Sequence, residues 1–203
     1  MTGESSDADT SGSDYAHRLA RLEEVWWRRL VPVQLPYTVH LKSLRLGRTL
    51  DVGCGIGRNL KNLQAGSLGV DHNADSVGIA RARGLDAYTV PQLEALPQDQ
   101  ASGFDALLFA HVLEHLGEQQ GANLLASYLP RLRPGGRVAL ITPQEKGYTT
   151  DSTHVRFMDF LALSVLVRSQ GLQVDGSYSF PLPRVAGRVF PYNEFVMRAR
   201  KPA

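Results

Sequence analysis

Residues 50–57 read Leu-Asp-Val-Gly-Cys-Gly-Ile-Gly and place three glycines between an apolar strand and a helical segment. Glycine has no Cβ, so it adopts positive φ in a tight turn and lets a ligand approach the backbone closely. Amides at the start of a helix also favour a negatively charged ligand group. This stretch therefore predicts a ligand-binding turn that follows a strand.

The spacing of the glycines bears on which ligand they bind. The nicotinamide fingerprint is G-x-G-x-x-G, whereas Gly57 follows Gly55 after a single residue. A second apolar run ends in Asp71, about 20 residues downstream, where a carboxylate accepts two hydrogen bonds from a ribose diol. The pattern predicts a nucleoside ligand with free hydroxyls and disfavours the alternative of a nicotinamide-dependent reductase.

Short apolar runs alternate with helical stretches from residue 49 onward. This alternation is typical of an α/β protein with a doubly wound parallel sheet, in which helices cover both faces. The predicted strands are 49–52, 67–71, 86–90, 106–109 and 137–142, and the predicted helices are 59–63, 74–83, 119–129 and 159–170.

The C-terminal part differs in character after the helix that Gly171 ends. Segments 172–177 and 193–200 have the pattern of two strands, and the loop between them contains proline and glycine. Such a segment predicts an antiparallel hairpin at one edge of the sheet. With the five earlier strands, the result is a seven-stranded, mostly parallel sheet with an antiparallel C-terminal strand.

The overall composition is that of one soluble domain. Hydrophobic residues make up 43% and charged residues 21% of the chain, and no apolar run reaches the roughly 18 residues of a membrane span. Cys54 is the single cysteine, and residues 1–14 carry neither a basic nor an apolar leader region. We therefore expect a cytoplasmic protein with a disordered tail at 1–14 and one domain at 15–203.

The charge of the chain is only weakly basic. The net charge is +2, and residues 1–14 contain four acidic and no basic side chains. Removing these four negative charges leaves +6 on residues 15–203, which is small for a nucleic-acid-binding surface. No nucleic-acid partner is expected.

Five motifs, taken together and in order, give the chain a family resemblance over residues 47–200. It resembles the class I S-adenosylmethionine-dependent methyltransferases, and within them the ubiquinone- and menaquinone-biosynthesis (type 11) branch. The resemblance implies a Rossmann-like methyltransferase fold and S-adenosylmethionine as cofactor. The motifs are LDVGCGIGRNL (50–60), GVDHN (69–73), FDALLFAHVLEHL (104–116), LPRLRPGGRVALITP (129–143) and THVRF (153–157).

The resemblance also implies roles for single residues around the cofactor. Amides of the glycine-rich turn would hold its methionine part, and Asp71 would hold its ribose hydroxyls. The family usually has an acid where Gln92 stands, so the side-chain oxygen of Gln92 is expected at the adenine amine. The full set of predicted cofactor-binding residues is Asp51, Gly53, Cys54, Gly55, Asp71, His72 (against the adenine face), Gln92, Leu93 (through its N–H) and Ala110.

Two helices are predicted ahead of the first strand, at 15–30 and 36–44. Trp26 lies on the apolar stripe of the first helix, so core packing is its expected role. Trp27 lies off the stripe and faces either the cavity or a partner subunit, which leaves a homodimer as an alternative. By the resemblance, residues 15–45 would form lid helices over the cofactor.

A group of metal-ligand residue types follows the fourth predicted strand. His111, Glu114 and His115 have i, i+3, i+4 spacing, which places them on one face of a helical turn. The quinone-pathway O-methyltransferases that the stretch resembles carry E-x-x-E-H here and bind a divalent cation with it, and His111 replaces their first Glu. The resemblance therefore implies a magnesium or manganese site. The alternative is a metal-free Glu-His pair that only organises the loop.

Candidate catalytic residues lie on the same side of the sheet. The THVRF element resembles a segment that lines the acceptor pocket in the family, so His154 is expected beside the reacting hydroxyl, as a base or as a further metal ligand. Without a metal, His115 or His154 would be the general base. The alternative for His154 is a structural role, as a loop histidine that hydrogen-bonds the backbone.

These groups predict the type of reaction. Methyl transfer from a sulfonium is an in-line displacement, and an alcohol reacts well only while its proton is leaving. We therefore expect O-methylation of a hydroxyl on a small molecule, sugar or glycan. The 18 arginines against four lysines are typical of a high-GC genome, which adds a methylmannose-type polysaccharide precursor to the candidates. Metal-independent N- or C-methylation of a small metabolite is the closest alternative, followed by a non-catalytic domain of the same fold.

Overall fold

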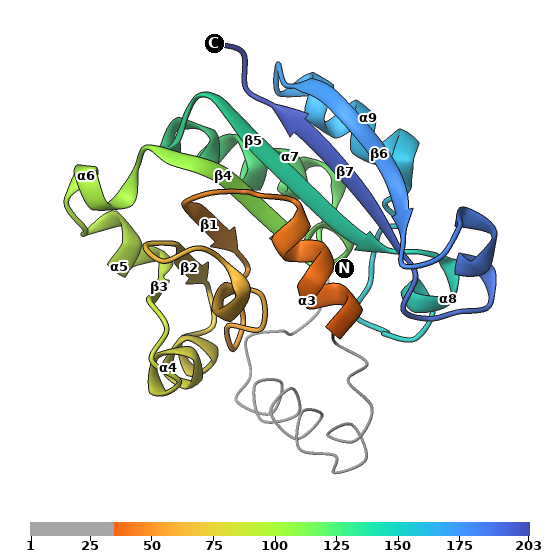
Figure 1. Cartoon of the computed structure of the whole chain (residues 1–203), viewed down its shortest axis with the longest axis horizontal. Coiled ribbons are helices and arrows are strands. Elements are labelled where there is room, and N and C mark those ends of the chain that lie inside the picture. Colours follow the sequence, from red (N-terminus) through yellow and green to blue (C-terminus); the bar gives the residue numbers. More distant parts are fainter. Residues whose placement is uncertain (1–34) are drawn as a thin grey trace, which may run out of the picture.

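Seven strands form one sheet in the computed structural model, which describes residues 35–203 (Figure 1). The strand order is β3-β2-β1-β4-β5-β7-β6, and the predicted α/β, mostly parallel architecture is confirmed. Strands β1 to β5 pair in parallel, whereas β7 runs antiparallel to β5 and β6. The strands span Thr49–Val52 (β1), Leu68–Asp71 (β2), Ala87–Thr89 (β3), Phe104–Ala110 (β4), Leu132–Pro143 (β5), Gln173–Phe180 (β6) and Glu194–Arg200 (β7).

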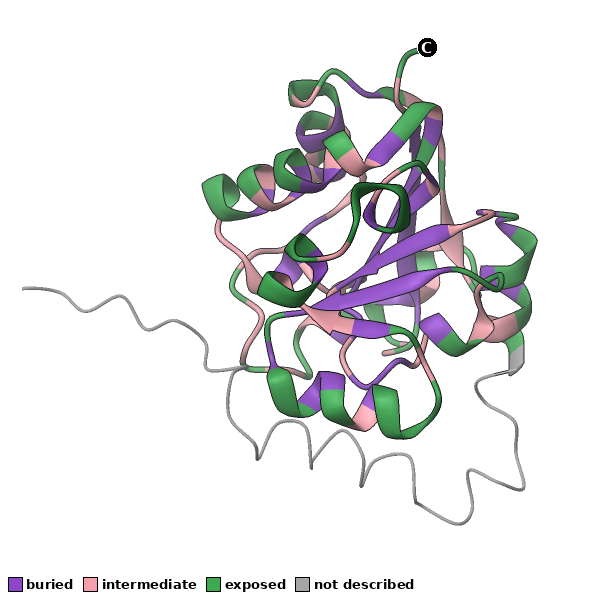
Figure 2. Ribbon diagram, turned by 90° about the vertical axis from the view of Figure 1, so that its left-hand side faces the viewer, coloured by how far each residue is buried: buried purple, intermediate pink, exposed green. Residues whose placement is uncertain are grey.

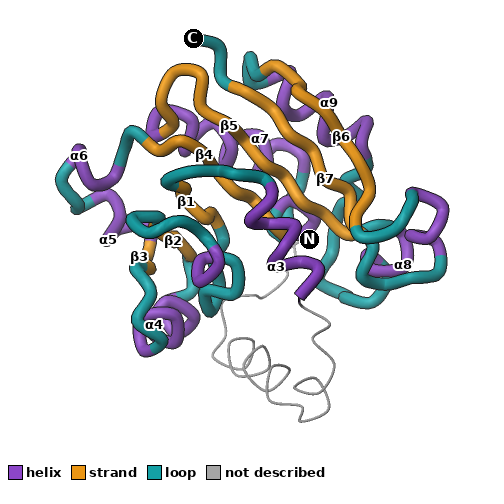
Figure 3. The backbone as a smooth tube through the Cα atoms, viewed as in Figure 1, coloured by secondary structure: helices purple, strands orange, loops and turns teal. Residues whose placement is uncertain are grey.

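The predicted C-terminal hairpin joins the sheet with β7 inside and β6 at the edge (Figure 3). Glu194, the first residue of β7, lies opposite Pro143 at the end of β5 and opposite Phe180 at the end of β6. Open α/β sheets bind ligands outside the carboxyl ends of their parallel strands. Because β7 runs the other way, its first residue, not its last, lies at this ligand-binding edge.

Helices cover both faces of the sheet, with α3 in front of it and α7 and α9 behind it in Figure 1. Leu41 of α3 packs in one apolar cluster with Ala106 and Ala139, and these small residues allow the helix to lie close to the strands. The opposite cluster contains Leu125 of α7 and Leu163 of α9. The helices are Leu35–Ser43 (α3), Ala74–Ala82 (α4), Val90–Glu94 (α5), Gln98–Ala101 (α6), Glu118–Tyr128 (α7), Glu145–Tyr148 (α8) and Phe160–Ser169 (α9), with 3₁₀ turns at Leu60–Asn62 (η1), Leu113–His115 (η2), Leu129–Arg131 (η3) and Arg184–Arg188 (η4).

The element boundaries differ from the predicted ones where proline and glycine interrupt the pattern. The predicted strand 137–142 extends backward to Leu132 through a Pro-Gly-Gly segment, and its pairing with β4 shifts register there. The predicted helix 59–63 is only a three-residue 3₁₀ turn, because Leu60 is its one buried side chain. Short helices such as α5 and α8 carry too few apolar residues to show a period.

The N-terminal predictions mostly concern residues that the structure does not describe. The tail at 1–14 and the helix at 15–30, with Trp26 and Trp27, lie outside the described residues. The helix predicted at 36–44 corresponds to α3. Within residues 35–203, no helix combines the length and the apolar character needed to cross a bilayer.

The central strands are almost entirely buried, as the purple ribbons of Figure 2 show. Ile141 of β5 is fully buried, so Ile141→Val removes one methyl group from the core and should lower the free energy of unfolding by about 1 kcal/mol. Urea denaturation measures this loss. The control is Leu161→Ala on α9, whose side chain is 72% exposed and whose change should stay within about 0.5 kcal/mol. Equal losses in the two variants would contradict the packing described here.

Candidate functional site

The glycine-rich turn leaves the end of β1 and adopts the backbone that the sequence predicts. Gly53 and Gly55 have φ values of +74° and +51°, and a Cβ at Gly53 would overlap the side chain of Val112. The amides of Gly53 and Cys54 donate to the carbonyl of Val70 at 2.8 and 3.1 Å. These two amides, predicted to hold the methionine part of a cofactor, therefore already have acceptors within the protein.

Asp71 is the last residue of β2, and its carboxylate hydrogen-bonds the glycine-rich turn. Its Oδ2 accepts from the amide of Gly55 at 2.8 Å, and its Oδ1 accepts from the amide of Asn73 at 2.9 Å. The His72 ring lies beside it, with 59% of its side chain exposed. Each carboxylate oxygen has two lone pairs, so Asp71 can brace the turn and still accept a hydrogen bond from a ligand.

A cavity of about 1090 Å³ opens at this edge of the sheet. This volume is slightly above the usual range for small-molecule sites, which is about 300–1,000 Å³, so the cavity has room for a cofactor and an acceptor together. Its lining comes from the glycine-rich turn, the end of β4, α3 and the β6–β7 loop. The residues that line it include Tyr37, Gly53, Cys54, Gly55, Asp71, His72, Val90, Ala110, His111, His115, Phe180, Phe190, Tyr192 and Glu194.

Three of the nine predicted cofactor residues, Asp51, Gln92 and Leu93, do not line this cavity. Gln92 caps α5, because its Oε1 accepts from the Thr89 amide at 3.0 Å and from Arg81 Nη2 at 2.9 Å. Leu93 is fully buried in the core. Neither residue lines the cavity, so their predicted adenine contacts stay predictions, and Val90 is the residue of this segment that lines the cavity.

Asp51 lies beneath the turn and is buried. Within the described chain, neither of its carboxylate oxygens has a hydrogen-bond partner. Burial, and secondarily the negative charge of Asp71, raise the pKa of Asp51 from 3.8 to about 8, although the nearby amide of Leu60 opposes this rise. The folded protein thus binds a proton at Asp51 more tightly than the unfolded chain does.

This shift predicts how stability depends on pH. Asp51 should contribute fully to the free energy of unfolding below about pH 4, and the contribution should be lost as pH rises through about 8. The variant Asp51→Asn carries no titrating group, so its stability should fall less steeply between pH 5 and 8.5 than that of the parent. Urea denaturation across this range compares the two slopes. Parallel slopes would show that Asp51 ionises in the folded protein as it does in the unfolded chain.

His111 follows β4 with a φ of +58°, and its ring joins two carboxylates. Its Nδ1 lies 3.2 Å from Glu114 Oε1, and its Nε2 lies 2.7 Å from Glu194 Oε1. The side chain is 44% accessible because it faces the cavity. Its deep position lowers the pKa of His111, but the hydrogen bonds and charges of the two carboxylates outweigh this effect and raise the pKa to about 10. Both ring nitrogens of His111 thus have carboxylate partners, and its predicted ligand role stays a prediction.

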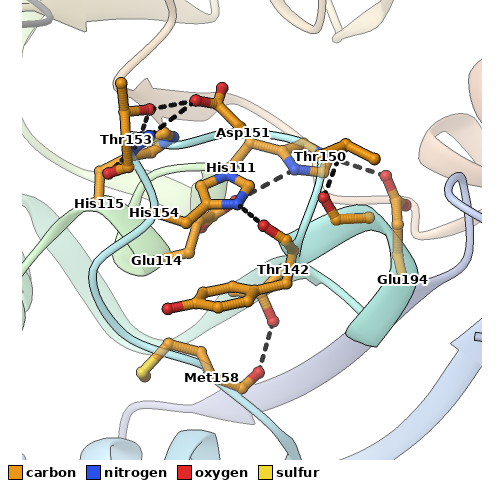
Figure 4. A network of polar contacts seen from close by, with 12 residues as sticks. His111, Glu114, His115, Thr142, Thr150, Asp151, Thr153, His154, Met158 and Glu194 are labelled. Atoms are coloured by element: carbon orange, nitrogen blue, oxygen red, sulfur yellow. Dashed lines mark hydrogen bonds and ion pairs between the residues drawn. The ribbon is translucent and has the colours of Figure 1, made fainter. Parts of the chain in front are cut away.

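A different trio meets the distance requirement of a metal site. Glu114, His115 and His154 each offer a ligand atom, and these atoms lie within 4.8 Å of one another (Figure 4). The Glu114 carbonyl accepts from the amides of Val155 and Arg156 at 2.9 and 3.1 Å. These bonds hold the segment around His154 against η2, and so bring the predicted catalytic histidine to the predicted metal ligands.

The protonation pattern of this trio suits a cation. His115 Nδ1 donates to the carbonyl of Thr153 at 3.2 Å, and His154 Nδ1 donates to the carbonyl of Tyr148 at 2.8 Å. Each Nε2 therefore keeps its lone pair, as in metal-ligating histidines whose other nitrogen is hydrogen-bonded. Burial lowers the pKa of His115, and Glu114 Oε2 has no hydrogen-bond partner among the described residues. His115 lines the cavity, whereas His154 does not.

Two cavity residues, Tyr37 and Glu194, are absent from the predicted site. Both have a buried oxygen without a hydrogen-bond partner in residues 35–203. The sequence contains a signal for Glu194, because the start of an antiparallel last strand lies at the ligand-binding edge. Tyr37 has no such signal, since its helix shows no apolar periodicity.

Comparison with known proteins gives a consistent picture. Residues 50–138 match a family model described as a methyltransferase domain. A ubiquinone biosynthesis O-methyltransferase from Xanthomonas oryzae pv. oryzae is 30% identical over 142 residues, which are 62% of this chain and 59% of that protein. The chain thus spans about three fifths of the length of the curated relatives it matches.

Solved structures share the fold at lower sequence identity. A SAM-dependent methyltransferase from Archaeoglobus fulgidus is 18% identical and superposes with a TM-score of 0.65, covering 91% of this chain and 99% of that one. A magnesium protoporphyrin IX methyltransferase from Synechocystis PCC 6803, crystallised with bound SAM, is 15% identical with a TM-score of 0.67, covering 99% and 100%. At these identities the likeness concerns the fold alone.

Proposed function

Because this chain belongs to the class I S-adenosylmethionine-dependent methyltransferases, we propose that it transfers a methyl group from S-adenosylmethionine to a hydroxyl of a small molecule or glycan. The observation that carries the proposal is the large cavity that the glycine-rich turn and Asp71 share with His111, His115 and Glu194. Residues suited to hold a cofactor and residues suited to a hydroxyl acceptor thus line one cavity.

The cofactor would lie along the end of β2. Asp71, whose carboxylate oxygens each have two lone pairs, would accept the ribose hydroxyls beside its bonds to the amides of Gly55 and Asn73. His72 and Val90, which line the cavity on this side, would flank the adenine. Gly53, Cys54, Gly55 and Ala110 would follow the methionine part. Asp51 lies under the turn without lining the cavity, so it would not contact the cofactor.

The acceptor half of the reaction needs a route for the hydroxyl proton. Glu114, His115 and His154 fit a divalent cation such as magnesium or manganese, because one carboxylate oxygen and two imidazole lone pairs lack other partners. When bound there, such a cation would lower the pKa of an acceptor hydroxyl. Without a cation, His115 is the better placed of the two predicted bases, because it lines the cavity and His154 does not.

The proposal is tested in two steps. Calorimetry with S-adenosylhomocysteine and with NADH measures which nucleotide the protein binds, and tight NADH binding would contradict the assignment. The protein is then incubated with S-adenosylmethionine and a panel of phenols, neutral sugars and amines, and mass spectrometry identifies the methylated product. Methylation of amines alone would favour the N-methyltransferase alternative over transfer to a hydroxyl.

A further inference from the structure

Glu194 reaches the cavity from a strand that the usual site motifs do not include. It begins β7 and pairs with the last residues of β5 and β6, at the carboxyl edge of the sheet. Its side chain is about one-tenth exposed and lines the cavity. The carboxylate therefore enters the same space as the cofactor turn, although 123 residues separate Glu194 from Asp71 in sequence.

The backbone around Glu194 is held by a buried amide network. Gln144 Nε2 donates to the Glu194 carbonyl at 2.9 Å, and Asn193 Nδ2 donates to Gln144 Oε1 at 2.9 Å. Both Gln144 and Asn193 are fully buried, and a Cβ at Gly187 would overlap Gln144. This network holds the backbone at the start of β7 in place, and so positions the Glu194 side chain at the cavity.

The hydrogen bonds of the Glu194 carboxylate are incomplete. Its Oε1 accepts from His111 at 2.7 Å, whereas its Oε2 has no partner among the described residues. The hydroxyl of Tyr37, which also lines the cavity, likewise lacks a partner there. An unsatisfied buried acceptor or donor destabilises a protein, so each such atom calls for an explanation such as a bound ligand.

These two atoms complement each other. Tyr37 and Glu194 line the same cavity, and after burial the charge of Glu194 is a further cause of the raised pKa of Tyr37. Tyr37 has a proton to donate and Glu194 has a lone pair to accept. A ligand hydroxyl satisfies both at once, because it accepts from Tyr37 and donates to Glu194. A carboxylate or phosphate ligand would instead meet a negative charge.

The neighbouring wall is apolar and partly aromatic. Phe180 and Pro181 at the end of β6, with Phe190 and Tyr192 of the β6–β7 loop, line the cavity. Flat aromatic faces pack well against an uncharged ring. The wall therefore complements the ring of a neutral acceptor whose hydroxyl lies between Tyr37 and Glu194.

We infer that Glu194 and Tyr37 bind the hydroxyl of a neutral, ring-containing acceptor, and that Glu194 takes its proton during methyl transfer. This inference rests on the proposed function. The acceptor oxygen forms a bond to the methyl carbon while the bond between this carbon and sulfur breaks. The electron pair of the broken bond stays on sulfur. The hydroxyl proton moves to Glu194 Oε2 and then to water. Tyr37 holds the acceptor oxygen in line with the methyl group.

The test compares binding of two probes to the complex with S-adenosylhomocysteine, in EDTA so that metal chelation plays no part. Catechol is a neutral ring with hydroxyl donors, and veratrole is its dimethyl ether without them. The parent protein should bind catechol at least about tenfold more tightly than veratrole, because only catechol donates a hydrogen bond to the Glu194 carboxylate. Glu194→Ala should abolish this preference, and Tyr37→Phe should reduce it. Glu118→Ala, on the outer surface with 78% of its side chain exposed, is the matched control.

The possible outcomes separate the inference from the proposed function. Failure of the parent protein to bind S-adenosylhomocysteine would refute the proposed function. Normal cofactor binding with equal affinity for catechol and veratrole, or with no catechol binding, would overturn the inference. So would a Glu194→Ala variant that loses affinity for S-adenosylhomocysteine, because Glu194 would then belong to the cofactor site. With a probe that the parent protein methylates, Glu194→Gln should lower kcat by about 10²-fold or more with little change in KM. Glu194→Asp should restore part of the lost kcat.

Discussion

Replacing Asp71 with alanine is expected to lower the affinity for S-adenosylhomocysteine by about 30- to 1,000-fold, which corresponds to about 2–4 kcal/mol for two lost hydrogen bonds to a carboxylate. The structure adds a second reason for a large effect. Asp71 also accepts from the amides of Gly55 and Asn73, at 2.8 and 2.9 Å. The alanine variant therefore loses ligand contacts and leaves the glycine-rich turn without its brace.

Two further variants separate these contributions. Asp71→Asn keeps one carbonyl oxygen for the turn but loses the charge, so its affinity should lie between those of the parent and Asp71→Ala. Asp86→Ala, an exposed acid just before β3, is the control and should bind like the parent. Calorimetry measures all three. Parental affinity in Asp71→Ala would mean that the ribose does not lie at the end of β2.

The fold was predictable because its strands carry their signal locally. Leu50, Leu107 and Leu140 are fully buried members of apolar runs, and a strand covered on both faces needs such a run. The position of Asp71 was predictable for a related reason, since it is the last residue of its strand and no distant contact is needed to place it. Short polar helices such as α8 were not predictable, because so few residues show no periodic pattern.

The roles of the site histidines were only partly predictable, because they depend on contacts far along the chain. His111 lies three residues before Glu114 and His115 directly after it, and this local spacing does not show which other residues each histidine contacts. In the structure, His111 contacts Glu194, which is 83 residues away in sequence, whereas His154 lies close to His115 and Glu114. Gln92 illustrates the opposite case, since a local capping bond to Thr89 uses the oxygen that the family resemblance assigned to the adenine.

Loss of the cation site is expected to abolish most turnover while leaving cofactor binding intact. Glu114, His115 and His154 would hold the cation, and none of them belongs to the glycine-rich turn or to the end of β2. Exhaustive EDTA treatment should therefore lower methyl transfer by about 10²-fold or more, since a bound cation supplies several kcal/mol of charge stabilisation. Calorimetry should find the affinity for S-adenosylhomocysteine nearly unchanged.

Direct binding of manganese tests the ligand set independently of activity. Equilibrium dialysis should find about one manganese ion per chain in the parent, and His154→Ala should weaken this binding by about 10- to 100-fold or more. Glu114→Gln should behave likewise, with partial rescue by excess magnesium or manganese, because the amide keeps the shape but not the charge. His111→Gln separates the two candidate sets: retained manganese binding supports the trio, and its loss restores His111 as a ligand. Full activity after EDTA with no bound metal would leave His115 or Glu194 to take the hydroxyl proton without a cation.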